Sequence, residues 1–346
     1  MKLVTFLNSN KTERLGVYFN NDVYDLESAG KKSGIDLPSD ILTLLSGGEK
    51  MMDNARSAEN KIIPGGCEPE SSFTLMAPVP HPPSCRDGYA FRQHVEAARR
   101  NRGVEMIPEF DQYPIFYFTN HNSIIGGGDV TIELDHLQKL DFELELAAVI
   151  GKKGRNIDSK NADSYIAGYT IMNDLSARTL QMEEMLLSLG PAKGKDFATA
   201  IGPWLVTPDE LVQYRIETEF GSLYSLRMTA KHNGELISDG NAKDMTWTFA
   251  EIIERASYGV DLYPGDVIGS GTVGTGCYLE LNGTRARIAR EKGTDYTPVW
   301  LKDGDTVELE ITGLGKLTNV MKLSGNNISI LSKKKLTTQK QESMHQ

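Results

Sequence analysis

Cysteine is scarce in this 346-residue chain, and Cys67, Cys85 and Cys277 match no metal-binding spacing. An odd number leaves one cysteine unpaired, so we expect free thiols and a reducing compartment, the cytoplasm or an equivalent. No apolar run approaches the roughly 20 residues that a membrane helix needs, and the first residues lack a signal-peptide core. The sequence therefore argues against a disulfide-stapled secreted domain and against a membrane partner.

Positive charge is also in short supply. The 37 Lys and Arg residues face 47 Asp and Glu residues, which gives a formal net charge of -10. A nucleic-acid surface needs clustered positive charge, so the composition argues against a nucleic-acid partner. A divalent cation or a small anionic substrate remains compatible with this balance.

Glycine and proline are abundant, at 33 and 14 residues, and predict many turns. Strand and helix patterns occur in mixed order, which favours an α+β, mainly β and mainly antiparallel architecture over a doubly wound sheet. We expect a small N-terminal β-rich domain over residues 1–75, a catalytic domain over 76–332 and a disordered tail over 333–346.

Local patterns predict the elements that would carry chemistry. Apolar runs predict strands over 142–151 and 165–174, and Asn233-Gly234 is typical of a hairpin turn. Helices are expected over 89–101 and 176–189. The alternation in CYLELNGT predicts a strand over 277–284.

Glu143 and Glu145 are the first chemical signal. Residues two apart in a strand point to the same face, and Asp141 shares that face. Three neighbouring acids repel one another unless something positive lies between them. They fit either a solvated sheet edge or a buried cation site, and the continuation into an apolar strand supports the cation site.

Further candidates lie in separate segments of the chain. Asp174 fits either an N-cap of the following helix or a metal ligand at a strand end. His94 needs a partner that orients its ring, and Glu280 is one candidate. Lys195 lies in a glycine-rich loop, where Lys193 is the alternative solvent charge.

A dinucleotide motif can be set aside on the same evidence. Gly269 to Gly274 satisfies GxGxxG, but that fingerprint requires a following helix, whereas the next residues alternate like a strand. Walker A, HExxH, GxSxG and CxxC motifs are absent from the sequence.

Taken together, these stretches resemble the fumarylacetoacetate hydrolase family over roughly residues 80–322. DFELELAAVIG resembles the family strand that carries two metal-binding glutamates, here Glu143 and Glu145. GYTIMNDLSARTLQ implies a third carboxylate ligand at Asp174 and a substrate contact at Gln181. LGPAKGKDFATAIGPW implies the family lysine at Lys195.

A finer resemblance points to the fumarylacetoacetase branch. CRDGYAFRQH implies a fourth metal ligand at Asp87, a substrate contact at Tyr89 and a catalytic base at His94. The same resemblance pairs that base with Glu280 and places a substrate-binding threonine at Thr272. The match departs at Met185, where the branch has a substrate-binding tyrosine, and at Leu175, where it has an aromatic residue.

The resemblance implies a mixed β-roll catalytic domain, a homodimer and a bound divalent cation, with Mg²⁺ preferred and Mn²⁺ or Ca²⁺ possible. It implies hydrolysis of a carbon–carbon bond in a β-diketo acid by water that His94 activates, with Lys195 assisting. The alternative is a decarboxylase, isomerase or hydratase that acts on an oxaloacetate-like oxo acid. A non-catalytic cation-binding protein would leave His94, Lys195 and Gln181 unexplained.

Overall fold

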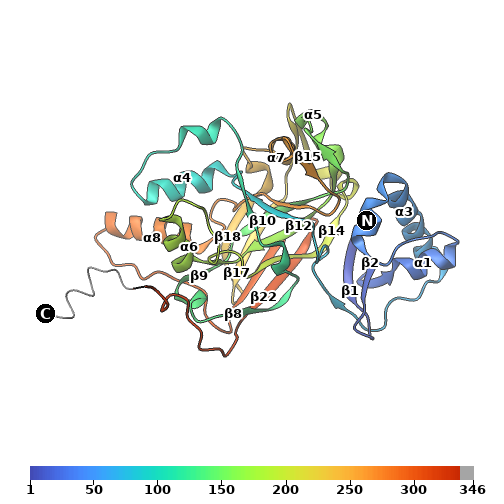
Figure 1. Ribbon diagram of the computed structural model, residues 1–346, viewed down its shortest axis with the longest axis horizontal. Coiled ribbons are helices and arrows are strands. Elements are labelled where there is room, and N and C mark those ends of the chain that lie inside the picture. The colour runs from blue at the N-terminus through green and yellow to red at the C-terminus, as the bar shows by residue number, and fades with distance from the viewer. Residues whose placement is uncertain (336–346) are drawn as a thin grey trace.

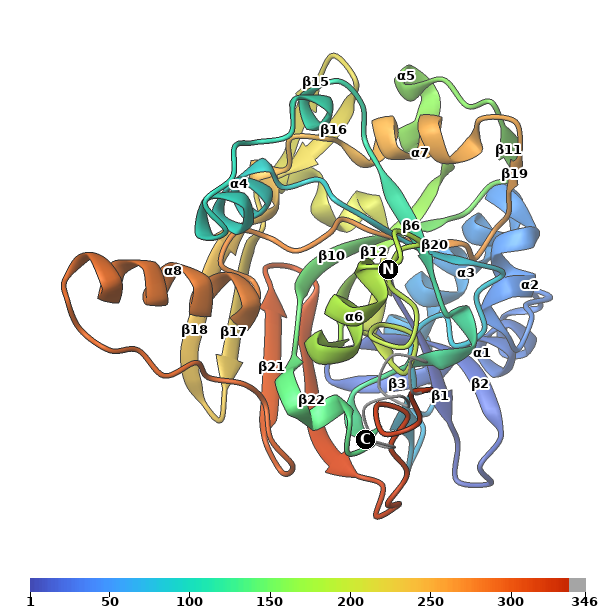
Figure 2. The ribbon, with the colours of Figure 1, turned by 60° about the vertical axis from the view of Figure 1, so that its left-hand side comes forward.

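The computed structural model describes residues 1–335, and for residues 62–65 it describes the backbone alone. The predicted tail covers residues 333–346, and its residues from 336 onward lie outside this part. An 11-stranded sheet crosses the molecule, with the main strand order β3-β2-β1-β14-β12-β10-β20-β5-β6 (Figures 1 and 2). Its strands are β1 Lys2–Leu7, β2 Glu13–Phe19, β3 Asp22–Asp25, β4 Thr74–Leu75, β5 Cys85–Gly88, β6 Phe116–Thr119, β7 Ile124–Ile125, β10 Leu144–Ile150, β12 Ile166–Asp174, β14 Thr199–Val206 and β20 Val267–Gly269.

A five-stranded sheet packs against this large sheet and has the order β18-β17-β21-β22-β8. Its strands are β8 Gly128–Ile132, β17 Arg227–His232, β18 Glu235–Asn241, β21 Thr306–Ile311 and β22 Gly315–Leu323. Three further pairs are β9 Leu140–Asp141 with β13 Ser176–Ala177, β11 Gly154–Arg155 with β19 Asp261–Leu262, and β15 Arg215–Thr218 with β16 Gly221–Tyr224. Most strand pairs are antiparallel, as the mixed order of elements predicted.

The helices lie around the sheets and at the two ends of the molecule in Figure 1. Their bounds are α1 Leu26–Ser33, α2 Ile41–Ser46, α3 Gly48–Gly65, α4 Arg92–Asn101, α5 Ser159–Ala162, α6 Arg178–Met185, α7 Phe249–Ser257 and α8 Tyr278–Glu291. In the part of the chain that the structure describes, no helix is long and apolar enough to cross a membrane.

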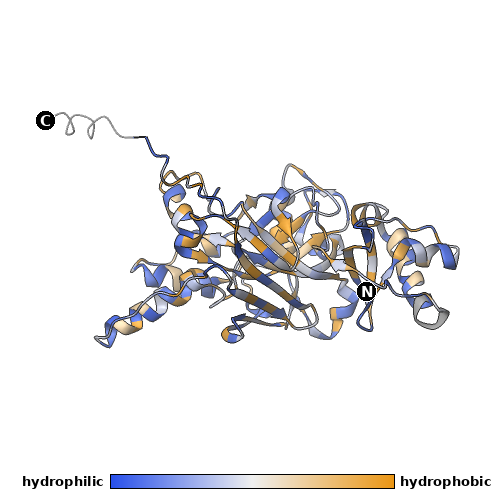
Figure 3. Ribbon diagram, turned by 90° about the horizontal axis from the view of Figure 1, so that it is seen from below, coloured by the Kyte–Doolittle hydropathy of each residue, from blue (hydrophilic) through white to orange (hydrophobic). Residues whose placement is uncertain are grey.

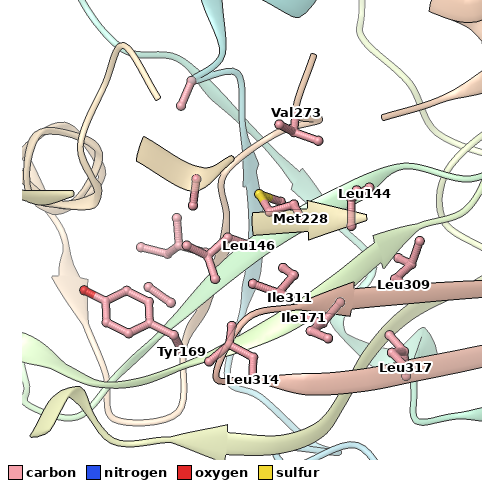
Figure 4. Close-up of a cluster of buried hydrophobic side chains, with 14 of the residues drawn as sticks. Leu144, Leu146, Tyr169, Ile171, Met228, Val273, Leu309, Ile311, Leu314 and Leu317 are labelled. Atoms are coloured by element: carbon pink, nitrogen blue, oxygen red, sulfur yellow. The ribbon is translucent and has the colours of Figure 1, made fainter. Parts of the chain in front are cut away.

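Strand β10 explains how two cores can meet at one sheet. Leu144 and Leu146 point into the main core, between the two sheets, where they lie near Ile171 and Ile311 (Figure 4). Ala147, on the opposite face, belongs to a second core that the N-terminal helices cover. Figure 3 shows hydrophobic residues concentrated on the central strands. Both faces of β10 are therefore buried, which is why every residue of the strand except Glu145 is apolar.

The N-terminal segment combines strands β1 to β3 with helices α1 to α3. Asp25 and Asp40 cap α1 and α2, each accepting a backbone N–H bond at 2.8 Å. Strand β1 pairs with β14, so this segment extends the large sheet. A boundary near residue 75 stays a prediction, and the sequence reasoning did not anticipate α3.

One element was predicted wrongly. Residues 277–284 do not form a strand, because helix α8 begins at Tyr278. The first turns of the helix are buried in the protein. Their buried residues are Tyr278, Glu280 and Asn282, which recur at every second position as the residues on one face of a strand do. A helix therefore does follow Gly274, so the reason given against a dinucleotide site was wrong.

Candidate active site

Four acidic side chains converge where neighbouring strands of the large sheet end. Asp87 comes from β5, Glu145 from β10 and Asp174 from the end of β12, while Glu143 immediately precedes β10. One carboxylate oxygen of each lies within 4.8 Å of the others. The four residues are at most 6% exposed, so they form no solvated sheet edge. Asp174 is no helix cap either, because α6 begins four residues later with Ala177 at its N-cap.

Glycine makes the close approach of two of these acids possible. Strand β20 lies between β10 and β5, and a Cβ atom on Gly269 would stand 2.6 Å from Asp87 Oδ1 and 2.9 Å from Glu145 Oε2. Gly271 has φ +78° and donates its N–H to the same two oxygens, at 3.1 and 3.2 Å. The GxGxxG segment thus shapes the carboxylate cluster.

Two buried cations lie between the acids. The Lys195 ammonium donates to Glu143 and, at 2.6 Å, to Asp174 Oδ2, which also accepts from the Tyr117 hydroxyl at 2.5 Å. The Arg178 guanidinium donates at 2.7 Å to Glu143 Oε1 and at 2.9 Å to Asp141 Oδ2. These cations supply the positive charge that the neighbouring acids require.

Protonation differs sharply within the cluster. Burial raises the pKa of Asp87 to about 8, with the Asp174 charge adding to the effect. Burial and the Asp87 charge also raise the pKa of Glu145 well above its ordinary range. Although burial opposes it, the Lys195 and Arg178 charges hold the pKa of Glu143 below its ordinary value. Without a bound cation, the Asp87 and Glu145 carboxyls thus tend to hold protons near pH 7.

A histidine–carboxylate pair lies next to this cluster. His94, on α4, places Nδ1 2.6 Å from Glu280 Oε2, and both residues are buried. Glu280 also accepts the Thr275 backbone N–H at 3.0 Å. A carboxylate at Nδ1 fixes the ring orientation and leaves Nε2 free to accept a proton.

Asp141 joins the two halves of the site. It is 0% exposed and accepts the backbone N–H groups of Tyr278 and Leu279 at 2.8 and 2.9 Å. Its charge thereby anchors the N-terminus of α8, which carries Glu280. Because Asp141 also binds Arg178, a single buried carboxylate positions both the His94 pair and the Glu143 side chain.

The remaining predicted contacts surround the same space. Gln181 accepts from Arg178 Nη1 at 2.9 Å, and the Thr272 hydroxyl is 3.5 Å from Glu145 Oε1. The Tyr89 ring lies edge-on to the His94 ring, with centroids 6.1 Å apart. The structure thus brings all ten predicted site residues to one region: Asp87, Tyr89, His94, Glu143, Glu145, Asp174, Gln181, Lys195, Thr272 and Glu280. Their roles stay predictions.

The structure decides between the two lysines that the sequence offered, because the Lys193 side chain is more than half exposed whereas Lys195 is buried.

Sequence reasoning assigned no role to three residues that contact the site. Arg178 and Tyr117 were missed, and Asp141 was noted but given no role. Arg178 could have been found, because the clustered acids require a cation and it follows Asp174 by four residues. Tyr117 lies in an aromatic run that gives no such signal.

Comparison with known proteins agrees with this arrangement. Residues 84–322 match the family model described as "Fumarylacetoacetate (FAA) hydrolase C-terminal". The human protein named "Oxaloacetate tautomerase FAHD2A, mitochondrial" is 32% identical over 292 residues, 82% of this chain and 80% of the relative. The Bacillus subtilis oxaloacetate tautomerase YisK is 30% identical over 312 residues, 86% of this chain and 92% of the relative.

A solved structure gives the same answer for the fold. The fumarylacetoacetate hydrolase from Exiguobacterium antarcticum has a TM-score of 0.67 and 25% identity, and the match covers 93% of this chain and 99% of that one. The fold and the sequence match define an enzyme with a mixed, mainly β catalytic unit. The chain belongs to the fumarylacetoacetate hydrolase family.

Proposed function

We propose that this protein is a metal-dependent tautomerase of an oxaloacetate-like 2-oxo acid. The observation that carries the proposal is the buried His94–Glu280 pair, which stands beside four carboxylates and the Lys195 ammonium. Tautomerisation requires one group that takes a proton from carbon and a positive environment that stabilises the resulting enolate. The names of the relatives from Homo sapiens and Bacillus subtilis support this reaction over hydrolysis.

The carboxylate cluster fits a divalent cation. Asp174 Oδ1 is buried and has no hydrogen-bond partner among residues 1–335, and the four side chains offer only hard oxygen donors. Such donors suit Mg²⁺, with Mn²⁺ or Ca²⁺ as alternatives. Asp87, Glu143, Glu145 and Asp174 would hold the ion. When bound, a dication supplies Lewis-acid polarisation of the substrate oxo group.

The protein side chains would then move one proton. Nδ1–H of His94 donates to Glu280, so Nε2 accepts the proton from carbon 3 of the oxo acid. The C3–H bond breaks, a C2=C3 double bond forms, and the former oxo oxygen becomes an enol when the proton held on Nε2 is passed to it, which returns His94 to its neutral form. Glu280 stabilises the intermediate imidazolium, and Lys195 neutralises charge at the oxygen. The reverse sequence returns the keto form.

Tyr89, Gln181, Thr272 and Arg178 would orient the substrate. The Arg178 guanidinium, which binds Asp141 and Glu143, also donates to Gln181 at 2.9 Å and so holds that side chain in place. Because the substrate is itself an anion, Arg178 and Lys195 offset the negative charge of the carboxylate cluster.

Hydrolysis of an acylpyruvate is the second candidate, and the same His94–Glu280 pair favours it. A histidine oriented by a carboxylate can also activate water for attack on a carbonyl carbon. Cleavage then releases an enolate and a carboxylic acid. The two reactions share the site and differ in whether a carbon–carbon bond breaks.

A product screen separates the two candidates. Purified protein with Mg²⁺ is given oxaloacetate, acetylpyruvate and fumarylacetoacetate, and the products are identified by mass and NMR. The proposal predicts rapid interconversion of oxaloacetate tautomers with no cleavage. Efficient cleavage of either diketo acid, with no effect on oxaloacetate, would replace the tautomerase with a hydrolase.

We also propose a homodimer in a reducing compartment, the cytoplasm by our sequence reasoning. The family resemblance supports the dimer, and three free cysteines support the compartment. Light scattering at micromolar concentration gives the mass directly, and a monomer mass would contradict the dimer.

A further inference from the structure

Cys277 is a buried nucleophile that the proposed reaction does not use. It precedes Tyr278 at the start of α8 and is 0% exposed. Its Sγ, a ring nitrogen of His94 and a carboxylate oxygen of Glu143 all lie within 4.8 Å of one another. This group and the group of four carboxylates have one residue in common, Glu143.

Two features direct this group toward a ligand. The Nδ1 atom of His94 is held by Glu280, which leaves Nε2 as the ring nitrogen that a ligand can use, and the residue is only 7% exposed. Cys277 is the N-cap residue of α8, and the positive end of a helix stabilises a thiolate when a cation replaces the thiol proton.

The chemistry of the donors decides which ion fits. Nitrogen, sulfur and oxygen are the ligand atoms that Zn²⁺ takes in proteins, and zinc sites with an open fourth position use three protein ligands. Mg²⁺ and Ca²⁺ prefer oxygen donors alone and have little affinity for a thiol. In tetrahedral zinc sites neighbouring ligand atoms stand roughly 3.3–3.6 Å apart. The three ligand atoms here lie within 4.8 Å of one another, so each pair needs to approach by about 1.5 Å at most.

The local charge also favours a cation. Two positive side chains, Arg178 and Lys195, bind Glu143 and repel a second dication. Six buried carboxylates outweigh these two charges, even when one divalent cation occupies the carboxylate cluster. The six are Asp87, Asp141, Glu143, Glu145, Asp174 and Glu280.

We propose that His94, Glu143 and Cys277 form a second cation site, selective for Zn²⁺ and similar borderline-soft ions, whose occupation inhibits the enzyme. The thiol releases its proton to solvent as the sulfur–metal bond forms. An ion on Nε2 leaves His94 unable to accept a proton from substrate. The inhibition rests on the proposed function of His94, but the binding of the ion does not.

Cobalt absorption tests the binding without any activity. Co²⁺ is added to the full chain in excess Mg²⁺, and the sulfur-to-cobalt charge-transfer band in the near ultraviolet is recorded. Only an ion on a cysteine gives this band, so Co²⁺ in the carboxylate cluster is silent. We expect the band in the wild type and its loss in Cys277→Ser, while the matched control Cys85→Ser, another buried cysteine, keeps it.

Zinc inhibition tests the consequence. We expect Cys277→Ser to keep its activity with Mg²⁺ and to require at least about tenfold more Zn²⁺ for half inhibition. A wild type without the cobalt band, or a band that survives in Cys277→Ser, would overturn the site. If Cys277→Ser does not fold, His94→Gln provides the test, since it should weaken Co²⁺ binding about tenfold or more. If the band behaves as expected but no substrate turns over, the proposed function fails and the site stands.

Discussion

Replacing Asp141 by Asn should cost about 3–5 kcal/mol of unfolding free energy. Asp141 Oδ2 accepts from Arg178 Nε and the Leu279 N–H, both at 2.9 Å, while Oδ1 accepts from the Tyr278 N–H at 2.8 Å and from the Phe142 N–H at 2.9 Å. An asparagine retains one acceptor oxygen and turns its NH₂ group toward two donors. A lost bond to a charged group is worth about 1.5–3 kcal/mol, and a buried group left unpaired about 1–3 kcal/mol.

Asp135 provides the matched control. It is 4% exposed and accepts from the Ser329 hydroxyl and the Ile330 and Leu331 N–H groups, but no arginine among the described residues binds it. Asp135→Asn should therefore cost only about 1–3 kcal/mol. Denaturant unfolding followed by circular dichroism measures both variants. An Asp141→Asn variant that is as stable as Asp135→Asn would refute the reasoning that the Arg178 pair is the larger contribution.

Three further outcomes follow from the site. Glu145→Gln should lower divalent-cation affinity at least about tenfold, which calorimetry measures. The fold should stay intact, because the raised pKa of Glu145 favours its neutral form and glutamine is neutral too. His94→Ala should lower kcat by about 10²–10⁴-fold with metal content unchanged by elemental analysis. The metal-free protein should lose stability between about pH 5 and 8: the pKa of Asp87 is raised from 3.8 to about 8, so the folded state holds more protons than the unfolded state in this window and deprotonation favours unfolding. Glu143 acts in the opposite direction, but only below its ordinary pKa of 4.5. A melting temperature that rises over this window without metal would contradict the pH argument.

The fold class could be predicted from the mixed order of strands and helices. Strands β10 and β12 could be predicted because their apolar patterns are long and continuous. It failed at α8, where the residues that face the protein repeat every second position and include Glu280. Packing against the site, and not local propensity, fixes that helix, since its N-terminus binds Asp141. A sequence pattern carries no signal for a contact made across 137 residues.

The site residues were predicted more fully than their partners. Glu143 and Glu145 follow from strand alternation and Asp174 from its place at a strand end, and the family resemblance implies the same three residues. Arg178 was not predicted as a site residue, because an arginine at the start of an expected helix is usually a charge on the protein surface. Only the structure shows it buried at 2% exposure between Asp141 and Glu143.

Hydrogen exchange at carbon 3 of oxaloacetate tests the central claim most directly. The substrate is followed by proton NMR in D₂O with the protein and Mg²⁺, then after chelation, and with His94→Ala. The account predicts rapid, metal-dependent loss of the carbon-3 signal with the carbon skeleton intact, and little loss with the variant. Exchange no faster than without protein, or exchange that His94→Ala leaves unchanged, would contradict it.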